Sequence, residues 1–230
     1  ARLWEACSQM DYRIHSSFNP KERELLFGET YQELHLDKIM SIAPSDKSDL
    51  LGVSVGIDKL LSENESIING EPNPEEEGDS SIKEKSIIDF PNFLMHVLRL
   101  YYAEHKKEAD IEIITLDEKN LLDAYEIVKP EPIEFIKYLL FYRVVFDRYV
   151  VKSIIEGTDE DQMRWTLKQP YKYDKTYNKV SYNNLYSKDK NRDSEDFKYI
   201  LKAVSVLQVS RRQRINKTYL FNILSWIIII

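Results

Sequence analysis

The segment from Pro132 to Glu156, PIEFIKYLLFYRVVFDRYVVKSIIE, constrains the fold of this chain more than any other. Large apolar side chains recur along it at helical spacing, which predicts a long helix buried on most of its circumference. Its charged residues are expected to keep the rest of the helix in water: Lys137, Arg143, Asp147, Arg148 and Lys152. We interpret Arg143 and Asp147, one turn apart, as an ion pair on the helix surface. A membrane span is disfavoured, because each of these charges would lie within the bilayer.

The composition favours helices elsewhere too. Only six glycines occur in 230 residues, which disfavours sandwiches, barrels and folds with glycine-rich nucleotide loops. We therefore expect an all-α protein, an irregular multi-helix bundle around one long central helix. A short β element is expected near residues 111–116 or 163–167, where β-branched residues alternate or the helical period is lost.

Helix start and stop signals divide the rest of the chain. Asn19-Pro20-Lys21-Glu22 combines an N-cap, a proline in the first turn and a capping-box glutamate, and Gly28 marks the end of that helix. Asp89 and Asp117 are predicted N-caps of later helices, the second of which ends before Pro130. Further helices are expected over these ranges: Arg2–Met10, Thr30–Ile42, Lys47–Glu63, Phe197–Val209, and from Asn216 or Thr218 onward.

An acidic, proline-bearing stretch provides the best internal boundary. Residues 64–88 include Glu71-Pro-Asn-Pro-Glu-Glu-Glu-Gly78 and few large apolar side chains, a composition typical of a flexible linker or surface loop. We accordingly predict an N-terminal helical subdomain over residues 1–63 and a main helical domain over residues 89–230.

The two ends of the chain and its cysteine content indicate whether it is part of a longer polypeptide and which compartment it occupies. The chain begins at Ala1 instead of Met and closes on the apolar run Trp226–Ile230, so we expect a piece of a longer polypeptide. The single Cys7 excludes an internal disulfide and any multi-cysteine zinc site, which favours a reducing, cytoplasmic location.

No sequence pattern nominates a catalytic or metal-binding residue. The four histidines are scattered, and His96 lies within an apolar helix where a core role is the simpler interpretation. Asp110 and the run Asp117-Glu118-Lys119 resemble the acidic residues and lysine of a metal-dependent nuclease. An N-cap explains Asp117 better, and we expect no cofactor in this fragment.

The charge distribution points to an anionic partner. Residues 168–217 hold thirteen lysines and arginines against five acids, a balance of +8, whereas the remainder carries −15. Cations interleaved with tyrosines can neutralise phosphates and stack on bases. The candidate nucleic-acid-binding residues are Lys172, Lys175, Lys179, Arg211, Arg212, Arg214 and Lys217. The alternative is a solvated segment whose cations neutralise the acidic remainder of the protein.

Five phrases resemble a known family. They are Leu3–Asp11 (LWEACSQMD), Phe18–Gly28 (FNPKERELLFG), Asp89–Arg99 (DFPNFLMHVLR), Phe135–Val151, and Leu207-Gln-Val-Ser-Arg-Arg212 onward. Together they resemble the helical region of the bacterial defence proteins similar to the GmrSD modification-dependent (type IV) restriction endonucleases. Each phrase is structural and none is a catalytic signature.

The resemblance implies a parent protein that restricts foreign, modified DNA. In that family a ParB/sulfiredoxin-like domain that binds and hydrolyses nucleotide precedes the helical region, and many members end in an HNH nuclease domain. Neither the glycine-glutamine-arginine motif of the first domain nor the His-Asn-His metal cluster of the second occurs in these residues. The resemblance therefore places nucleotide and divalent metal in the parent protein and transfers no catalytic residue to this chain.

Two functions remain open. The first is a non-catalytic helical fragment of a restriction protein, which links catalytic domains and contacts DNA. The second is a protein–protein interaction or oligomerisation module without affinity for nucleic acid. The expected partners are accordingly DNA, the missing domains of the same polypeptide, or a second copy of the chain.

Overall fold

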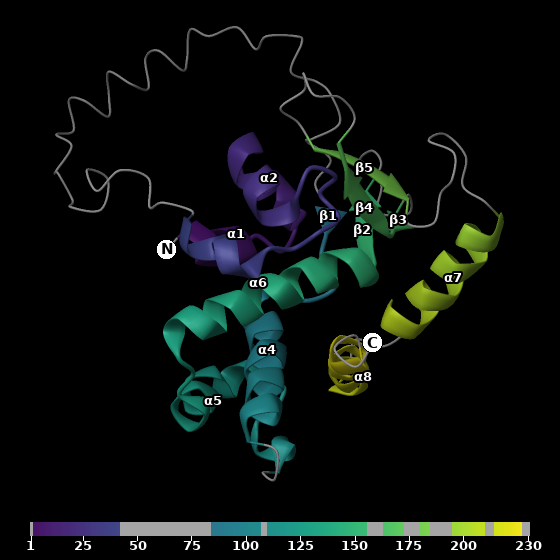
Figure 1. Cartoon of the computed structure of the whole chain (residues 1–230). Coiled ribbons are helices and arrows are strands. Elements are labelled where there is room, and N and C mark those ends of the chain that lie inside the picture. Colours follow the sequence, from purple (N-terminus) through teal and green to yellow (C-terminus); the bar gives the residue numbers. More distant parts are fainter. Residues whose placement is uncertain are drawn as a thin grey trace, which may run out of the picture.

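A computed structural model describes residues 2–41, 84–106, 110–155, 163–172, 180–184, 195–209 and 214–226. The protein is mostly helical, as expected, but it is not a clean all-α bundle, because two small antiparallel sheets accompany the helices (Figure 1). The α-helices are α1 (Arg2–Ser8), α2 (Pro20–Phe27), α4 (Phe90–His105), α5 (Leu121–Val128), α6 (Pro132–Tyr149), α7 (Glu195–Val209) and α8 (Arg214–Trp226). Short 3-10 turns lie between them: η1 (Ile14–Ser17), η2 (Leu36–Ser41), η4 (Ile111–Ile113) and η5 (Glu118–Asn120).

Helix α6 is the central element, as predicted, but it is shorter than expected. The Glu131 carboxylate caps its first turn by accepting from the backbone N–H groups of Ile133 and Glu134, and Pro132 opens the helix. The helix ends at Tyr149, because Val150 is extended and the residues after it form strand β2. The β-branched pair Val150-Val151 disfavours continuation of the helix, and β2 begins directly after it at Lys152.

The core surrounds α6. Helix α1 packs on one side of it and α4 on another (Figure 1). The predicted core face of α4 is confirmed: Phe93, Leu94, Val97, Leu98 and Tyr101 are all buried. The Asp89 carboxylate caps this helix by accepting from Asn92 N–H at 3.0 Å. One apolar cluster joins these helices to α2 and to the buried face of α8.

Helix α2 begins and ends where its signals predicted. Asn19 and Glu22 form the reciprocal capping box, each contact 3.0 Å long. Gly28 ends the helix with φ +70°, a conformation that glycine adopts without the steric cost of a side chain.

The helix predicted over Thr30–Ile42 does not form in the described part of this range, residues 30–41, where the 3-10 turn η2 occurs instead. The segment after Gly28 instead folds back over the end of α2. There the N–H groups of Glu33 and His35 donate to the carbonyls of Phe27 (3.2 Å) and Leu26 (2.7 Å). Those carbonyls lack intrahelical partners, so the fold-back satisfies them.

The possible strand at residues 111–116 is also absent. The carboxylate of Asp110 accepts from Glu112 N–H at 2.9 Å and starts the 3-10 turn η4 there. Asp117 is an N-cap, as predicted, although of the 3-10 turn η5 that leads into α5.

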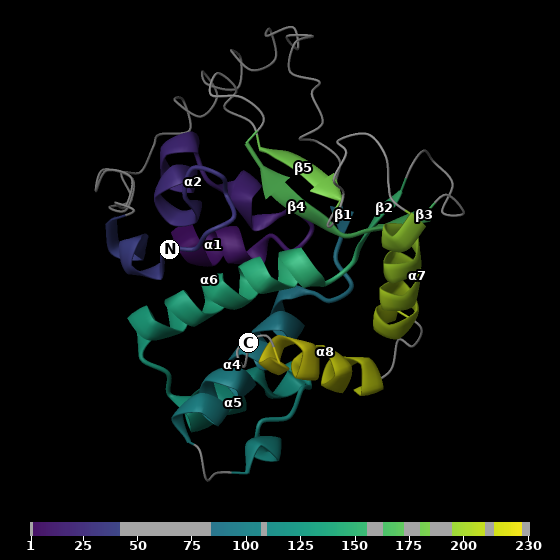
Figure 2. The ribbon, with the colours of Figure 1, turned by 45° about the vertical axis from the view of Figure 1, so that its right-hand side comes forward.

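The strands lie beyond the C-terminal end of α6 (Figure 2). The first sheet has the order β1 (Glu84–Lys85), β2 (Lys152–Ile155) and β3 (Met163–Thr166), all antiparallel. The β element predicted near 163–167 is therefore confirmed as β3. Strands β4 (Lys168–Tyr171) and β5 (Ser181–Asn184) pair antiparallel as a second sheet, with Lys168 opposite Asn184.

The end of the predicted acidic linker takes part in this architecture. Glu84 and Lys85, within residues 64–88, pair with β2, and the Glu84 side chain is buried. The predicted helix over Lys47–Glu63 and the linker up to residue 83 lie outside the described residues, and the domain division stays a prediction.

Candidate functional site

A buried ionic network occupies the junction of α6, the first sheet and the loop after α1. We use this name for Arg13, Glu84, Arg143, Asp147 and Lys152. Arg143 and Asp147 form an ion pair within α6, and Lys152 Nζ lies 2.8 Å from Asp147 Oδ1. The side chains of Arg143 and Lys152 are 0% exposed and that of Asp147 is 4% exposed. The prediction that these three charges lie on a wet helix surface is therefore wrong.

The cations bind the backbone at the end of α1. Arg143 donates to the carbonyls of Cys7 (3.2 Å), Gln9 (3.1 Å) and Tyr12 (2.6 Å). Lys152 donates to the carbonyls of Met10 (2.8 Å) and Tyr12 (3.1 Å). Of these acceptors only Cys7 lies within α1, where the last carbonyls lack intrahelical donors. The others belong to the loop after α1, so the two cations hold this loop against α6 and β2.

Arg13 connects the strands to α6. Its Nε lies 2.8 Å from Glu84 Oε2, and its Nη1 donates to the carbonyls of Asp147 (2.6 Å) and Lys168 (2.8 Å). Thr166 in β3 donates its hydroxyl to Glu84 Oε1 at 2.9 Å. One arginine from the N-terminal segment thus fixes α6, β1 and β4 relative to one another.

The carboxylate of Asp147 holds the loop that carries Arg13. Its Oδ2 accepts from the backbone N–H of Ile14 at 2.6 Å, while its Oδ1 faces the two cations. Burial alone raises the pKa of Asp147, but the charges of Arg143, Lys152 and Arg13 outweigh burial and hold this pKa well below its usual range. Asp147 is therefore ionised throughout the neutral range.

Burial depresses the basicity of two neighbours. Desolvation lowers the pKa of Lys152 to about 8, against the opposing attraction of Asp147. Desolvation lowers the pKa of His15 to about 3, so its imidazole is neutral near pH 7. Cys7 is buried too, and desolvation raises the pKa of its thiol to about 12, which leaves it protonated and unreactive.

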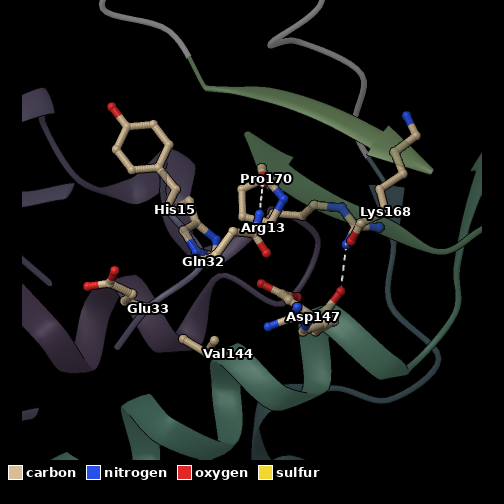
Figure 3. A pocket seen from close by; sticks show the side chains of 10 residues that line it. Arg13, His15, Gln32, Glu33, Val144, Asp147, Lys168 and Pro170 are labelled. Atoms are coloured by element: carbon tan, nitrogen blue, oxygen red, sulfur yellow. Dashed lines mark hydrogen bonds between the residues drawn. The ribbon is translucent and has the colours of Figure 1, made fainter. Parts of the chain in front are cut away.

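A small pocket lies beside the network (Figure 3). Its volume is about 20 Å³, enough for a water-sized group. The lining residues include Arg13, His15, Gln32, Val144, Asp147 and Arg148. His15 Nδ1 is buried and makes no hydrogen bond to the part of the chain that the structure describes. Arg13 is already paired with Glu84, and Asp147 with Arg143 and Lys152. The pocket therefore suits a bound water better than a substrate.

The predicted nucleic-acid-binding residues are only partly described. Lys172, which follows β4, forms an ion pair with Glu24 of α2, and its Nζ lies 6.0 Å from the centroid of the Tyr31 ring. Arg214 and Lys217 fall in the first turns of α8. Lys175, Lys179, Arg211 and Arg212 lie outside the described residues. Lys172 thus pairs with an acidic residue of the N-terminal segment. This is the arrangement expected if the cations of the basic segment neutralise acids of the same protein and not phosphates.

The candidate nuclease residues have structural roles in the described region. Asp110 and Asp117 cap η4 and η5 through their carboxylates. No group of three or more metal-ligating side chains occurs among the described residues. His96, expected in the core, is fully buried in α4.

Sequence reasoning missed the network because its members come from distant segments. No local pattern marks Arg13, and Glu84 fell within the predicted linker. One signal was available: Arg143 and Asp147 stand at i and i+4 in a stretch that is otherwise mostly large and apolar, which favours a buried pair.

The described helices include none that is both long enough and apolar enough to span a membrane. When the chain is compared with protein-family models, with curated proteins and with solved structures, no match is found.

Proposed function

We propose that this chain is a non-catalytic helical region of a bacterial DNA-restriction protein similar to the GmrSD family, which links catalytic domains and contacts DNA through its basic third. Its architecture would be an irregular bundle around α6, with two small sheets at one end. The resemblance supports this assignment, since four of its phrases fall on α1, α2, α4 and α6. These helices supply much of the core, and α6 carries Arg143 and Asp147 of the ionic network, as expected of structural phrases.

The observation that carries the DNA contact is the separation of charge along the chain. Residues 168–217 carry +8 and the remainder −15. Within the protein, Lys172 is neutralised by the exposed carboxylate of Glu24. The side-chain hydrogen bond from Lys172 lowers the pKa of Glu24, so this carboxylate is ionised near pH 7 and competes with any phosphate for the same lysine.

Competition between Glu24 and a DNA phosphate for Lys172 predicts the direction in which a substitution changes the affinity. We expect Glu24→Gln to strengthen binding of a fluorescent DNA duplex about twofold to fivefold at low salt, because Lys172 then becomes available to a phosphate. Fluorescence anisotropy across a salt series measures the affinity and its salt slope. Glu5→Gln, which removes an exposed acid of α1, is the matched control and should leave the affinity unchanged.

Charge reversal addresses the rest of the segment. Reversing Arg211, Arg212 and Arg214 to glutamate should weaken DNA binding and reduce the salt slope by about one for each phosphate that is no longer neutralised. If the wild-type chain binds neither duplex nor single-stranded DNA at low salt, DNA contact by this region is excluded. The sequence that flanks these 230 residues in the full-length protein tests the family assignment separately.

Exposed apolar residues on α7 and α8 favour the second candidate, an oligomerisation module. Tyr199, Val206 and Trp226 are large and exposed. If α7 pairs with a second copy, the molar mass from light scattering should rise with concentration, and Val206→Glu should return it to the monomer value. A wild-type chain that stays monomeric at high concentration would exclude this module.

A further inference from the structure

Helix α5 exposes much of its apolar surface. Its sequence, LLDAYEIV, is largely hydrophobic, yet Ala124 is its one buried residue. Leu122 is 81% exposed, and Tyr125 and Ile127 are also exposed. A leucine left in water gains none of the free energy of burial, so an apolar helix face exposed to this extent is unusual.

The start of α6 extends this apolar area. Ile133 is exposed at the second position of α6, directly after the short connection from α5. The rings of Tyr125 and Phe135 lie 5.8 Å apart, which holds α5 against α6. We call Leu122, Tyr125, Ile127 and Ile133 the α5 surface. Both views place α5 beside α4, at the end of the molecule away from the sheets (Figures 1 and 2).

Acidic residues lie among the apolar residues of the α5 surface. Residues 110–134 contain eight acids and two lysines. Asp123, Glu126 and Glu131 are exposed on α5 itself and on its connection to α6. With 3.6 residues per turn, Glu126 and Asp123 lie between Leu122 and Ile127 around the helix, so this surface presents apolar and acidic side chains next to one another.

The sign of this charge selects the partner. A second copy docking through the same surface would bring acids against acids, and DNA or an anionic membrane would be repelled. A partner must therefore offer apolar side chains for contact and positive charge to meet the acidic residues. An amphipathic helix with basic residues beside an apolar stripe provides both, with the apolar residues at spacings i, i+3, i+4 and i+7. We propose that the α5 surface docks a basic amphipathic helix of a partner protein. This proposal does not depend on DNA contact by the basic third.

Synthetic peptides of defined charge test the proposal. The probe is a fluorescent 18-residue helical peptide with leucines on one face and lysines elsewhere. One comparison peptide replaces every lysine with glutamate, and a second keeps the composition but scrambles the apolar face. We expect the leucine–lysine peptide to bind, the glutamate peptide not to bind, and the scrambled peptide to bind at least about tenfold more weakly.

Variants of the chain locate the binding. Leu122→Ser should weaken binding of the leucine–lysine peptide about tenfold, and Asp123→Asn with Glu126→Gln should weaken it and flatten its salt dependence. Trp226→Ser is the matched control, because it removes a comparably exposed apolar residue on α8 (70%). It should leave the affinity unchanged.

Three outcomes would overturn the proposal: equal binding of the scrambled peptide, an unchanged affinity for Leu122→Ser, or a concentration-dependent dimer that Leu122→Ser abolishes. The last would assign the surface to a second copy. Circular dichroism confirms that each variant is folded. Tyr125→Ser repeats the test at a second position if Leu122→Ser alters the spectrum.

Discussion

Replacing Asp147 with asparagine is expected to lower the free energy of unfolding by about 3–5 kcal/mol. The substitution leaves Arg143 and Lys152 buried without their common counter-charge, and it weakens the acceptor of Ile14 N–H. Removing one member of a buried ionic group costs far more than removing an exposed pair, because water cannot replace the lost partner. Chemical denaturation followed by circular dichroism measures the loss.

The control is the exposed ion pair between Glu24 and Lys172. Glu24→Gln should leave the free energy of unfolding almost unchanged, as is usual for pairs in contact with water. A loss below about 1 kcal/mol for Asp147→Asn as well would show that the network does not stabilise the fold.

Coupling within the network gives a second readout. Lys152→Met removes one buried cation, so adding it to Asp147→Asn leaves fewer uncompensated charges than Asp147→Asn alone. The double variant should therefore lose less stability than the sum of the two single variants. Strict additivity would contradict the assignment of these residues to one electrostatic unit.

Acid should destabilise the protein in a window set by His15. In the unfolded chain a histidine has a pKa of about 6.5, whereas burial lowers the folded-state pKa of His15 to about 3. Between these values the unfolded state binds a proton that the folded state excludes, so stability is present above pH 6.5 and is lost as the pH falls towards 3. The expected loss from pH 6.5 to pH 4 is about 3 kcal/mol.

Below about pH 4 a second group adds to this loss. The pKa of Asp147 is held below its unfolded value of about 3.9, so the stability that its charge supplies is lost only at still lower pH. The two groups therefore act in successive pH windows, His15 first.

A variant that lacks His15 isolates the first window. His15→Asn should flatten the dependence of unfolding free energy on pH between 6.5 and 4, even if it lowers stability overall. His35→Asn removes a partly exposed histidine beside Glu33 and should retain the wild-type slope. An equally steep acid loss in His15→Asn would assign the window to other groups.

Local signals in the sequence predicted much of the helical framework. The capping box at Asn19, the N-cap at Asp89 and the first turn of α6 depend on residues within four positions of one another, so their geometry follows from the local sequence. The apolar face of α4 follows from its period for the same reason.

Tertiary partners decided the remainder. Residues 30–41 do not form the expected helix because the N–H groups of Glu33 and His35 satisfy the end of α2. Strand β2 replaces the end of the expected central helix because β1 and β3 flank it. Periodicity alone cannot distinguish the expected helix from the observed structure in either segment, since both arrangements keep the apolar residues inside.

The position of the charges shows the division most clearly. The sequence determined that Arg143 and Asp147 lie one turn apart on an apolar helix, and therefore that they pair. Whether that pair faces water or the interior depended on the loop after α1, on Arg13 and on Glu84, which are distant in the chain. A buried charge is tolerated only where several partners converge on it, and that convergence is a property of the folded chain as a whole.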